Sequence, residues 1–347
     1  MENTTEKVSE LSLNQVSSQS DKNLIQLSDE IRLSLKRPSL NVWNIQDKQM
    51  LDLLEHMFHD LGLVTEFKMD DKILENFLCR VQNNYRANPF HNFRHGFCVT
   101  QMMYSVICAC RLQDRLPPAD IVGLIVASLC HDLDHPGLNN AYQVNAGTEL
   151  AARYKNKSPL ENHHWAVTQQ ILSHPQSNIF CNTDPGDATH MQEEIKELIL
   201  ATDMINHGHV LRCLQEIHGM DPSDRKHVSV LKKGLIKFCD ISNEVRPAEQ
   251  AEIWADALLE EYFLQSDREK AEGLPVTPYM DRDTVTKATA QSSFIDSLLL
   301  PLCEALGKIL PQMNNLALKP LAEAKRRYQR QMEKTHRTDL PIYSPSV

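Results

Sequence analysis

Two short histidine clusters carry the strongest chemical signal in the sequence. The segment HNFRH (91–95) places His91 and His95 four residues apart, so that on a helix both rings project from one face. The segment HDLDHPGLNN (131–140) opens with adjacent His131 and Asp132. An imidazole nitrogen beside a carboxylate suits a hydrolytic site with one zinc ion and one harder ion. A His-Asp pair alone is common by chance, but two histidine clusters at this spacing predict a metal site.

Four side chains could form such a site, namely His95, His131, Asp132 and Asp240. Two nitrogens and two oxygens are typical of Zn²⁺ with open positions for water. Asp132 could bridge to a second ion, usually Mg²⁺ or Mn²⁺. Two ions about 3.5–4 Å apart could hold a hydroxide, because metal coordination lowers the pKa of water to about 7. His91, one helical turn from His95, is then a candidate general acid.

The same residue types also have structural interpretations. A lone histidine is more often a hydrogen-bonded core residue than a ligand, Asp240 could merely cap a helix, and the adjacent His163 and His164 could form a solvent-exposed pair. The remaining histidines are interpreted as structural or surface residues: His56, His59, His174, His190, His207, His209, His218, His227 and His336.

Composition favours an all-α fold, a compact multi-helix bundle. The 347 residues include only 11 glycines and 6% aromatics, and helix-favouring residues run throughout without a repeat, a coiled-coil heptad or a β-rich block. The apolar share of 41% is enough for a sizeable core. A formal net charge of −10 argues against a general binder of nucleic acid or anionic membranes, because both reward a basic surface.

Cysteine usage and hydropathy predict a cytoplasmic protein. The nine cysteines include no CxxC pair, and the N-terminus has no apolar signal-peptide core, so reduced thiols are expected. The most apolar run, IVGLIVASLC (121–130), is too short to span a bilayer. It is expected to be a buried helix that delivers His131 and Asp132 to the interior.

Residues 1–42 are polar and are expected to be a disordered leader. Helical periodicity begins after them, so one domain is expected at 43–334, followed by a tail at 335–347. Asp120 is a plausible N-cap of the apolar 121–130 helix. Residues 181–190 are expected to be a loop, and residues 265–283 a longer loop of the kind that forms lids. The other helices are expected at 51–62, 70–86, 91–110, 158–172, 193–203, 231–240, 284–300, from 302, and at 321–334.

Six motifs together resemble the catalytic domain of class I 3′,5′-cyclic nucleotide phosphodiesterases. They are HNFRH, HDLDHPGLNN, LENHH, ATDM, CDISNEVRP and EGLPVTPYMDRDTVTKATAQSSF, in matching order across about residues 45–330. The pattern H-D-L-x-H-x-G-x-x-N is highly specific to this family. NPFHNFRH, LENHH and EGLPVTPYMDRD are most similar to its cGMP-specific type-9 branch.

The resemblance implies a role for each matching residue. His95, His131, Asp132 and Asp240 match the zinc ligands, Asp132 also touches the magnesium, and His91 protonates the departing O3′. Five residues fall where the family holds metal-bound waters or orients the acid: His135, Asn140, Glu161, His164 and Thr202.

The resemblance also implies a purine pocket. Gln291 hydrogen-bonds the purine edge and Phe294 stacks on the base, one helical turn apart. Further residues expected to line this pocket are Asn243, Met204, Leu258, Tyr262 and Tyr279. The chain departs from the family pattern in having Ser292 and Ser293 before Phe294, where a glycine is usual, and Tyr279 where the type-9 branch commonly has Phe.

The leading hypothesis is hydrolysis of 3′,5′-cyclic GMP to 5′-GMP by a metal-bridging hydroxide, with His91 as general acid. A glutamine amide can present either a donor or an acceptor to a purine, so a cAMP-preferring or dual-specificity enzyme stays open. Another His-Asp phosphohydrolase would have no reason for the Gln291 and Phe294 clamp. A catalytically silent cyclic-nucleotide-binding regulator would be favoured by a missing ligand or acid, and none of the five is missing. A homodimer is left open.

Overall fold

The computed structural model describes residues 29–338, and every regular element in that range is a helix, which confirms the all-α prediction. The α-helices are α1 Asp29–Leu35, α2 Asp47–Asp60, α3 Leu63–Glu66, α4 Asp71–Asn83, α5 Phe93–Cys110, α6 Pro118–Cys130, α7 Asn140–Asn145, α8 Glu149–Arg153, α9 Pro159–Ser173, α10 Pro185–Ala201, α11 His207–Gln215, α12 Arg225–Asp240, α13 Ala248–Glu272, α14 Lys287–Phe294, α15 Leu300–Ile309 and α16 Lys319–Thr338. Short 3₁₀ or π segments are η1 Val42–Asn44, η2 Leu112–Asp114, η3 Met204–Asn206, η4 Ser242–Val245, η5 Ile295–Leu299 and η6 Asn314–Leu318.

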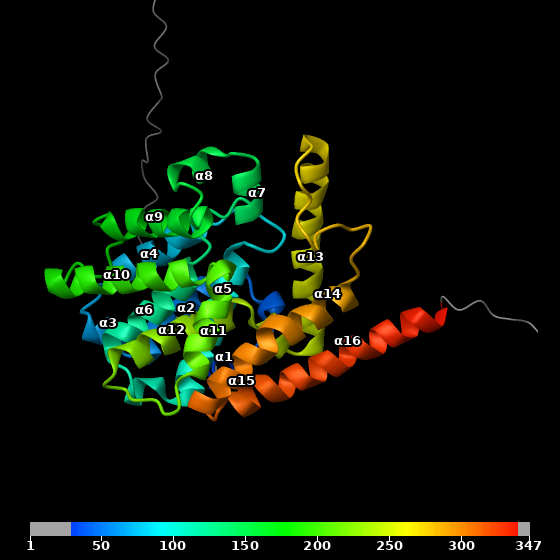
Figure 1. Cartoon of the computed structure of the whole chain (residues 1–347). Coiled ribbons are helices and arrows are strands. Elements are labelled where there is room, and N and C mark those ends of the chain that lie inside the picture. The colour runs from blue at the N-terminus through cyan, green and yellow to red at the C-terminus, as the bar shows by residue number, and fades with distance from the viewer. Residues whose placement is uncertain (1–28, 339–347) are drawn as a thin grey trace, which may run out of the picture.

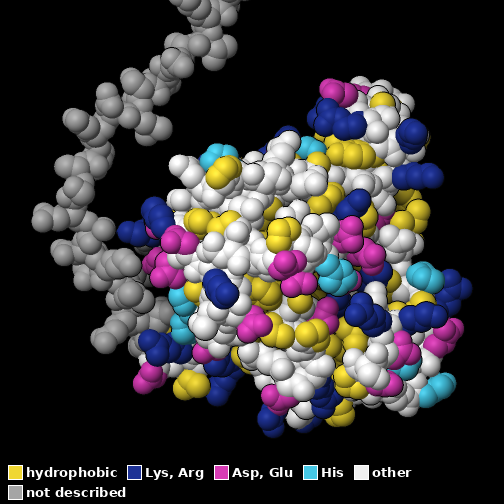
Figure 2. Space-filling model, turned by 90° about the vertical axis from the view of Figure 1, so that its left-hand side faces the viewer, with side chains coloured by type: hydrophobic (Ala, Val, Ile, Leu, Met, Phe, Trp, Pro, Cys, Tyr) yellow, Lys and Arg dark blue, Asp and Glu magenta, His cyan; other side chains and the backbone are white. Residues whose placement is uncertain are grey.

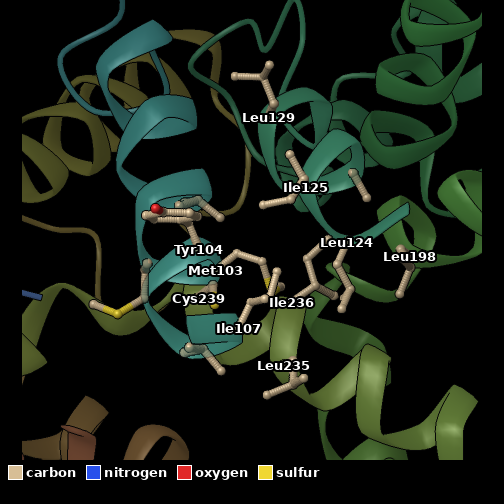
Figure 3. Packing of buried hydrophobic residues seen from close by; sticks show 14 of the residues in the cluster. Met103, Tyr104, Ile107, Leu124, Ile125, Leu129, Leu198, Leu235, Ile236 and Cys239 are labelled. Carbon is tan, nitrogen blue, oxygen red and sulfur yellow. The ribbon is translucent and has the colours of Figure 1, made fainter. Parts of the chain in front are cut away.

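The core is built around α5, α6 and α12. A helix that is apolar all round must be buried on every side, and each residue of α6 from Ile121 to Cys130 is buried. α6 packs against both α5 and α10. Figure 3 shows Met103 and Ile107 of α5, Leu124 and Ile125 of α6, and Ile236 of α12 meeting in this core.

The start of α5 and the ends of α6 and α12 lie close together. The side chain of Asn92 caps α5 by accepting the backbone N–H of His95 at 3.2 Å, which starts the helix beside the first histidine motif. α6 stops at Cys130, so His131 and Asp132 follow directly from its buried end. α12 ends at Asp240 itself. Packing of the three helices therefore determines where the candidate ligands meet.

Helices α13 and α16 form the outer side of the molecule. In Figure 1, α13 stands as a yellow column beside the main body, and the end of α16 projects away from it. α16 is attached where Arg327 and Tyr328 hydrogen-bond the buried carboxylate of Glu244, at 2.9 and 3.0 Å. The face in Figure 2 intermixes basic, acidic and apolar side chains. Among the described residues, no helix is long and apolar enough to cross a bilayer.

The prediction of a disordered leader at residues 1–42 is wrong for residues 29–42. Residues 1–28 lie outside the described range. Residues 29–35 form α1, and Leu35, Leu40 and Val42 are buried. The reason is tertiary, since the backbone carbonyls of this polar stretch have partners in the body. Gln101 of α5 donates to the carbonyls of Leu35 and Arg37, at 2.7 and 2.9 Å.

Three other expected boundaries are corrected. Residues 265–272 belong to α13, whose buried Gln265 and Glu269 continue its inner face, so the loop begins at Gly273. α10 begins at Pro185, inside the expected 181–190 loop, because Asp184 caps it. α6 begins at Pro118, with Pro117 rather than Asp120 at the N-cap position.

Candidate active site and metal centre

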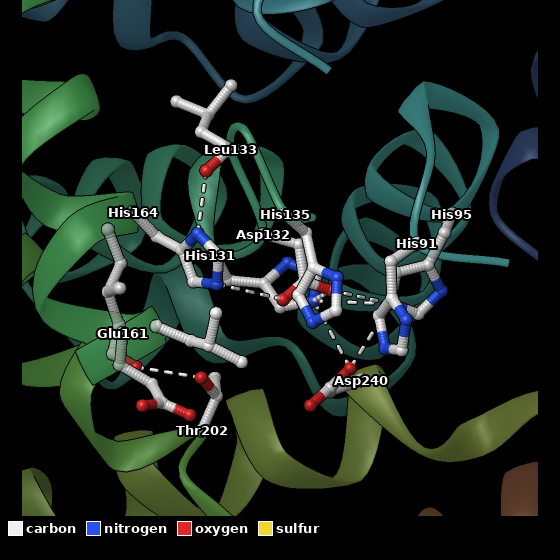
Figure 4. Close-up of polar contacts among 12 residues, drawn as sticks. His91, His95, His131, Asp132, Leu133, His135, Glu161, His164, Thr202 and Asp240 are labelled. Atoms are coloured by element: carbon white, nitrogen blue, oxygen red, sulfur yellow. Dashed lines mark hydrogen bonds and ion pairs between the residues drawn. The ribbon is translucent and has the colours of Figure 1, made fainter. Parts of the chain in front are cut away.

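The four predicted metal ligands converge at the meeting point of α5, α6 and α12. His95 Nε2 lies 3.2 Å from His131 Nε2 and 3.2 Å from Asp240 Oδ1. His131 Nε2 lies 3.1 Å from Asp240 Oδ1 and 3.0 Å from Asp132 Oδ2. The two histidines are almost fully buried, and the carboxylates form the more open side of the cluster. Figure 4 shows all four side chains turned toward one point.

The tautomer of His131 leaves a lone pair aimed into this cluster. Its Nδ1 lies 2.9 Å from the carbonyl oxygen of Ser128, which can only accept, so Nδ1 carries the proton. Nε2 of a neutral His131 is then an acceptor that faces the oxygens of Asp132 and Asp240. Acceptors crowded at 3.0–3.1 Å repel one another unless a proton or a metal cation lies between them. Burial by itself would lower the pKa of His131, but without an ion the two carboxylates raise it.

The spacing of these atoms fits Zn²⁺. Ligands about 2.0–2.1 Å from a tetrahedral ion lie about 3.3 Å from one another. The separations between His95 and the other three donor atoms run from 3.2 to 3.4 Å, and those of His131 to the carboxylates are 3.0 and 3.1 Å. Two imidazole nitrogens and two carboxylate oxygens are also a usual donor set for zinc.

A second group of side chains surrounds the other oxygen of Asp132. His164 Nε2 lies 3.6 Å from Asp132 Oδ1, and His135 belongs to the same cluster. His164 Nδ1 lies 2.6 Å from the carbonyl oxygen of Leu133, so its Nε2 is an acceptor facing a carboxylate (Figure 4). A metal ion, or a water bound to it, placed between these two acceptors would remove their repulsion. Oxygen donors with open positions for water suit Mg²⁺ or Mn²⁺.

His91 lies beside the metal cluster and is held by a buried glutamate of α13. Its Nδ1 is hydrogen-bonded to Glu261 Oε1. The other oxygen, Oε2, accepts the backbone N–H groups of Phe90 and His91 at 2.9 and 3.0 Å. The ring of His91 also stacks on His135, with centroids 4.0 Å apart. These contacts orient the ring and leave Nε2 for another partner.

The carboxylate of Glu261 also controls the charge of His91. Burial by itself would lower the pKa of His91, but the charge and the hydrogen bond of Glu261 outweigh it and raise the pKa to about 9. The imidazole is therefore protonated at neutral pH, the state that a general acid needs.

Comparison with known proteins agrees with this geometry. A family model described as 3′5′-cyclic nucleotide phosphodiesterase matches residues 90–321. The chain belongs to that family.

Two curated relatives are named "High affinity cGMP-specific 3′,5′-cyclic phosphodiesterase 9A". The human one is 53% identical over 87% of this chain and 51% of its own length. The mouse one is 52% identical over 87% of this chain and 57% of its own length. The chain therefore spans about half the length of these relatives. The crystal structure of the phosphodiesterase domain of Salpingoeca rosetta rhodopsin phosphodiesterase superposes with a TM-score of 0.85, at 26% identity, covering 91% of this chain and 98% of that one.

Three further predicted site residues, Asn140, Glu161 and Thr202, lie on α7, on α9 and at the end of α10. Asn140 donates to both carboxylate oxygens of Glu161, at 3.1 and 2.9 Å, and accepts the N–H of Leu160. Burial is the main cause that raises the pKa of Glu161 to about 7. Thr202 is buried at the end of α10 and donates to the carbonyl of Ile199.

The solvent-exposed His163–His164 pair of the alternative interpretation does not occur. His164 is 1% exposed and directed at the metal cluster, whereas its neighbour His163 pairs with Asp134 at 2.7 Å. Adjacent residues on α9 point in different directions, because successive helical positions are rotated by about 100°.

The residues of the predicted purine pocket differ in burial. Gln291 and Ser292 are buried in α14, and Phe294 and Leu258 are partly buried against the core. Asn243 and Tyr262 are also half-buried, on η4 and α13. Met204 and Tyr279 are 43% and 80% exposed.

The exposure of Tyr279 does not match a residue that lines a pocket. The loop after α13 is tied back where Glu269 accepts the N–H of Thr277 at 2.7 Å and Lys270 pairs with Asp281 at 2.7 Å. This arrangement buries Met280 and leaves Tyr279 outside, with a left-handed φ of 66°.

Sequence reasoning missed Glu261. A periodicity signal was available, because Trp254, Leu258, Glu261 and Gln265 recur at three- and four-residue spacing on the inner face of α13. A carboxylate in such a stripe needs a partner, since burying it without one is costly. Which partner it has cannot be read from the spacing.

Proposed function

We propose that this chain hydrolyses 3′,5′-cyclic GMP to 5′-GMP, using Zn²⁺ at His95, His131, Asp132 and Asp240 and Mg²⁺ or Mn²⁺ on the Asp132 side. The observation that carries the proposal is that the donor atoms of His95, His131 and the two carboxylates lie at zinc-like spacing, with a glutamate-held His91 adjacent. The bound ions would supply positive charge to the phosphate and lower the pKa of water.

The residues of the chain account for the proton that the leaving group needs. Hydrolysis breaks the bond between phosphorus and O3′, and water adds to phosphorus. O3′ then departs with a proton, which we assign to Nε2 of His91, because Nδ1 is engaged by Glu261. His135, stacked on His91, has its pKa lowered well below the usual range, mainly by burial and then by the charge of His91. It is therefore neutral and does not compete as the acid.

Preference for cGMP is supported by the names of the curated relatives and by their sequence identity to this chain. Relatives named cGMP-specific range from 37% to 53% identical, whereas a relative named as a cAMP phosphodiesterase is 30% identical. The buried amide of Gln291 is consistent with either base, because it can rotate to offer donor or acceptor.

The deciding experiment is hydrolysis of cGMP and cAMP side by side at submicromolar substrate, with Mg²⁺, with Mn²⁺ and with chelator. We expect metal-dependent turnover that favours cGMP. Equal use or a cAMP preference would keep the reaction and reject the cGMP assignment. No turnover of either nucleotide by metal-loaded protein would favour a binding regulator instead.

A further inference from the structure

The turn that joins the metal ligand Asp132 to His135 is attached to its surroundings at nearly every residue. The carbonyl of Leu133 accepts from His164 at 2.6 Å. The backbone N–H of Asp134 donates to the carbonyl of Asn84 at 2.8 Å. The side chain of Asn88 donates to the carbonyl of His135 at 2.7 Å. The turn is therefore fixed from α9 on one side and from the segment after α4 on the other.

Asp134 is the residue at which this turn reverses direction. Its φ is 58°, in the left-handed region that side chains other than Gly, Asn and Asp rarely adopt. The reversal keeps Asp132 in the metal cluster while His135, the residue after Asp134, returns to stack on His91.

The carboxylate of Asp134 is held from two directions. Arg86, in the segment after α4, donates from Nε to Oδ1 at 2.5 Å. His163, on α9, lies with Nε2 2.7 Å from Oδ2. Among the described residues, the groups that could hold a metal do not include Asp134. Arg86 and His163 come from segments far apart in sequence, so the carboxylate joins them across the turn.

We propose that Asp134 is a positioning residue for the metal centre. Its left-handed backbone and its two-sided clamp by Arg86 and His163 aim Asp132 at the metal cluster and His135 at His91. This inference deepens the proposed function, because it concerns the same site. Removing the Asp134 side chain should therefore weaken metal binding. Removal of a residue that orients a metal ligand typically lowers metal affinity about 10- to 100-fold.

The test measures Mn²⁺ binding to chelator-treated protein by calorimetry, together with kcat, KM for cGMP and melting temperature. Asp134→Ala should weaken Mn²⁺ binding about tenfold and lower kcat by a similar factor, with KM changed less than about twofold. Asp134→Asn, which tolerates the left-handed conformation and keeps one acceptor, should recover most of the affinity. Arg86→Met removes one side of the clamp and should give a loss of about threefold.

Two controls separate positioning from general stability. Lys68→Ala alters another non-glycine residue with a left-handed φ, 50°, and Arg153→Ala removes a surface ion pair to Glu149 of 2.8 Å. Both should bind Mn²⁺ like the unmodified chain. If Asp134→Ala and Arg86→Met lowered the melting temperature but left Mn²⁺ affinity unchanged, the positioning role would be wrong. Because Mn²⁺ binding needs no turnover, this result is independent of whether cGMP is hydrolysed.

Discussion

His91 Nδ1 is hydrogen-bonded to Glu261 Oε1 across a sequence separation of 170 residues. This contact joins the segment before α5 to the middle of α13 and places a carboxylate directly behind the imidazole. A histidine held this way has one fixed orientation and a raised affinity for its proton.

Replacing Glu261 by Gln should move the basic limb of the pH–rate profile to lower pH. Glu261 raises the pKa of His91 to about 9, so a His91 acid is active at neutral pH and loses its proton as pH rises through that value. Without the negative charge, loss of activity should begin about 1–2 pH units lower. The profile of kcat/KM for cGMP measures this, with Glu260→Gln, an exposed neighbour, as the control. An unshifted limb would separate Glu261 from the ionisation of the acid.

Replacing His91 by Ala should cut turnover about 100- to 10,000-fold while metal content stays intact. The reason is that His91 lies beside the cluster without belonging to its four ligands. Elemental analysis of the purified variant gives the metal content, and a cGMP assay gives the rate. Loss of zinc from this variant would refute the assignment of His91 as an acid rather than a ligand.

Replacing Asp240 by Ala should remove metal as well as activity. Asp240 Oδ1 lies within 3.2 Å of both ligand histidines, and no other described carboxylate takes its place in this cluster. Metal content per chain measures the effect, with Asp256→Ala as a control, because Asp256 is an exposed acid paired with Lys287. Full metal retention in Asp240→Ala would remove Asp240 from the ligand set.

Replacing Lys237 by Met should destabilise the fold more than the same change at Lys233. Lys237 is buried and donates to the carbonyls of Ala201, Thr202 and Asp203, at 2.9, 3.3 and 3.0 Å, where α10 ends. Leaving buried carbonyls without a donor costs about 1–3 kcal/mol.

Lys233, one turn earlier on α12, pairs with the exposed Glu197 at 2.9 Å. Surface pairs contribute about 0–1 kcal/mol. Denaturant unfolding of both variants gives the comparison, and equal losses would contradict the capping role of Lys237.

The sequence by itself determined the residue types and the local geometry of the site. The apolar run that ends at His131 and the recurrence of helical periodicity depend only on short-range properties of the chain. The all-α class and the two histidine motifs could be predicted for the same reason. The helix expected from His91 begins instead at Phe93, after the Asn92 cap, so His91 lies ahead of it and only His95 is on the helix. The family motifs also pointed to Asp240 as a ligand.

Only the tertiary structure decided which distant residues meet. Asp240 is 145 residues from His95, and their 3.2 Å contact depends on how α12 packs beside α5. Glu261 was missed because its partner lies on another element, and a buried carboxylate on a helix face does not specify that partner. The prediction of disorder is wrong for residues 29–42 for a related reason. Backbone carbonyls of this polar stretch accept hydrogen bonds from side chains such as Gln101, which is far along the chain. Periodicity is a local property, whereas hydrogen bonds between elements depend on the packing of the whole core.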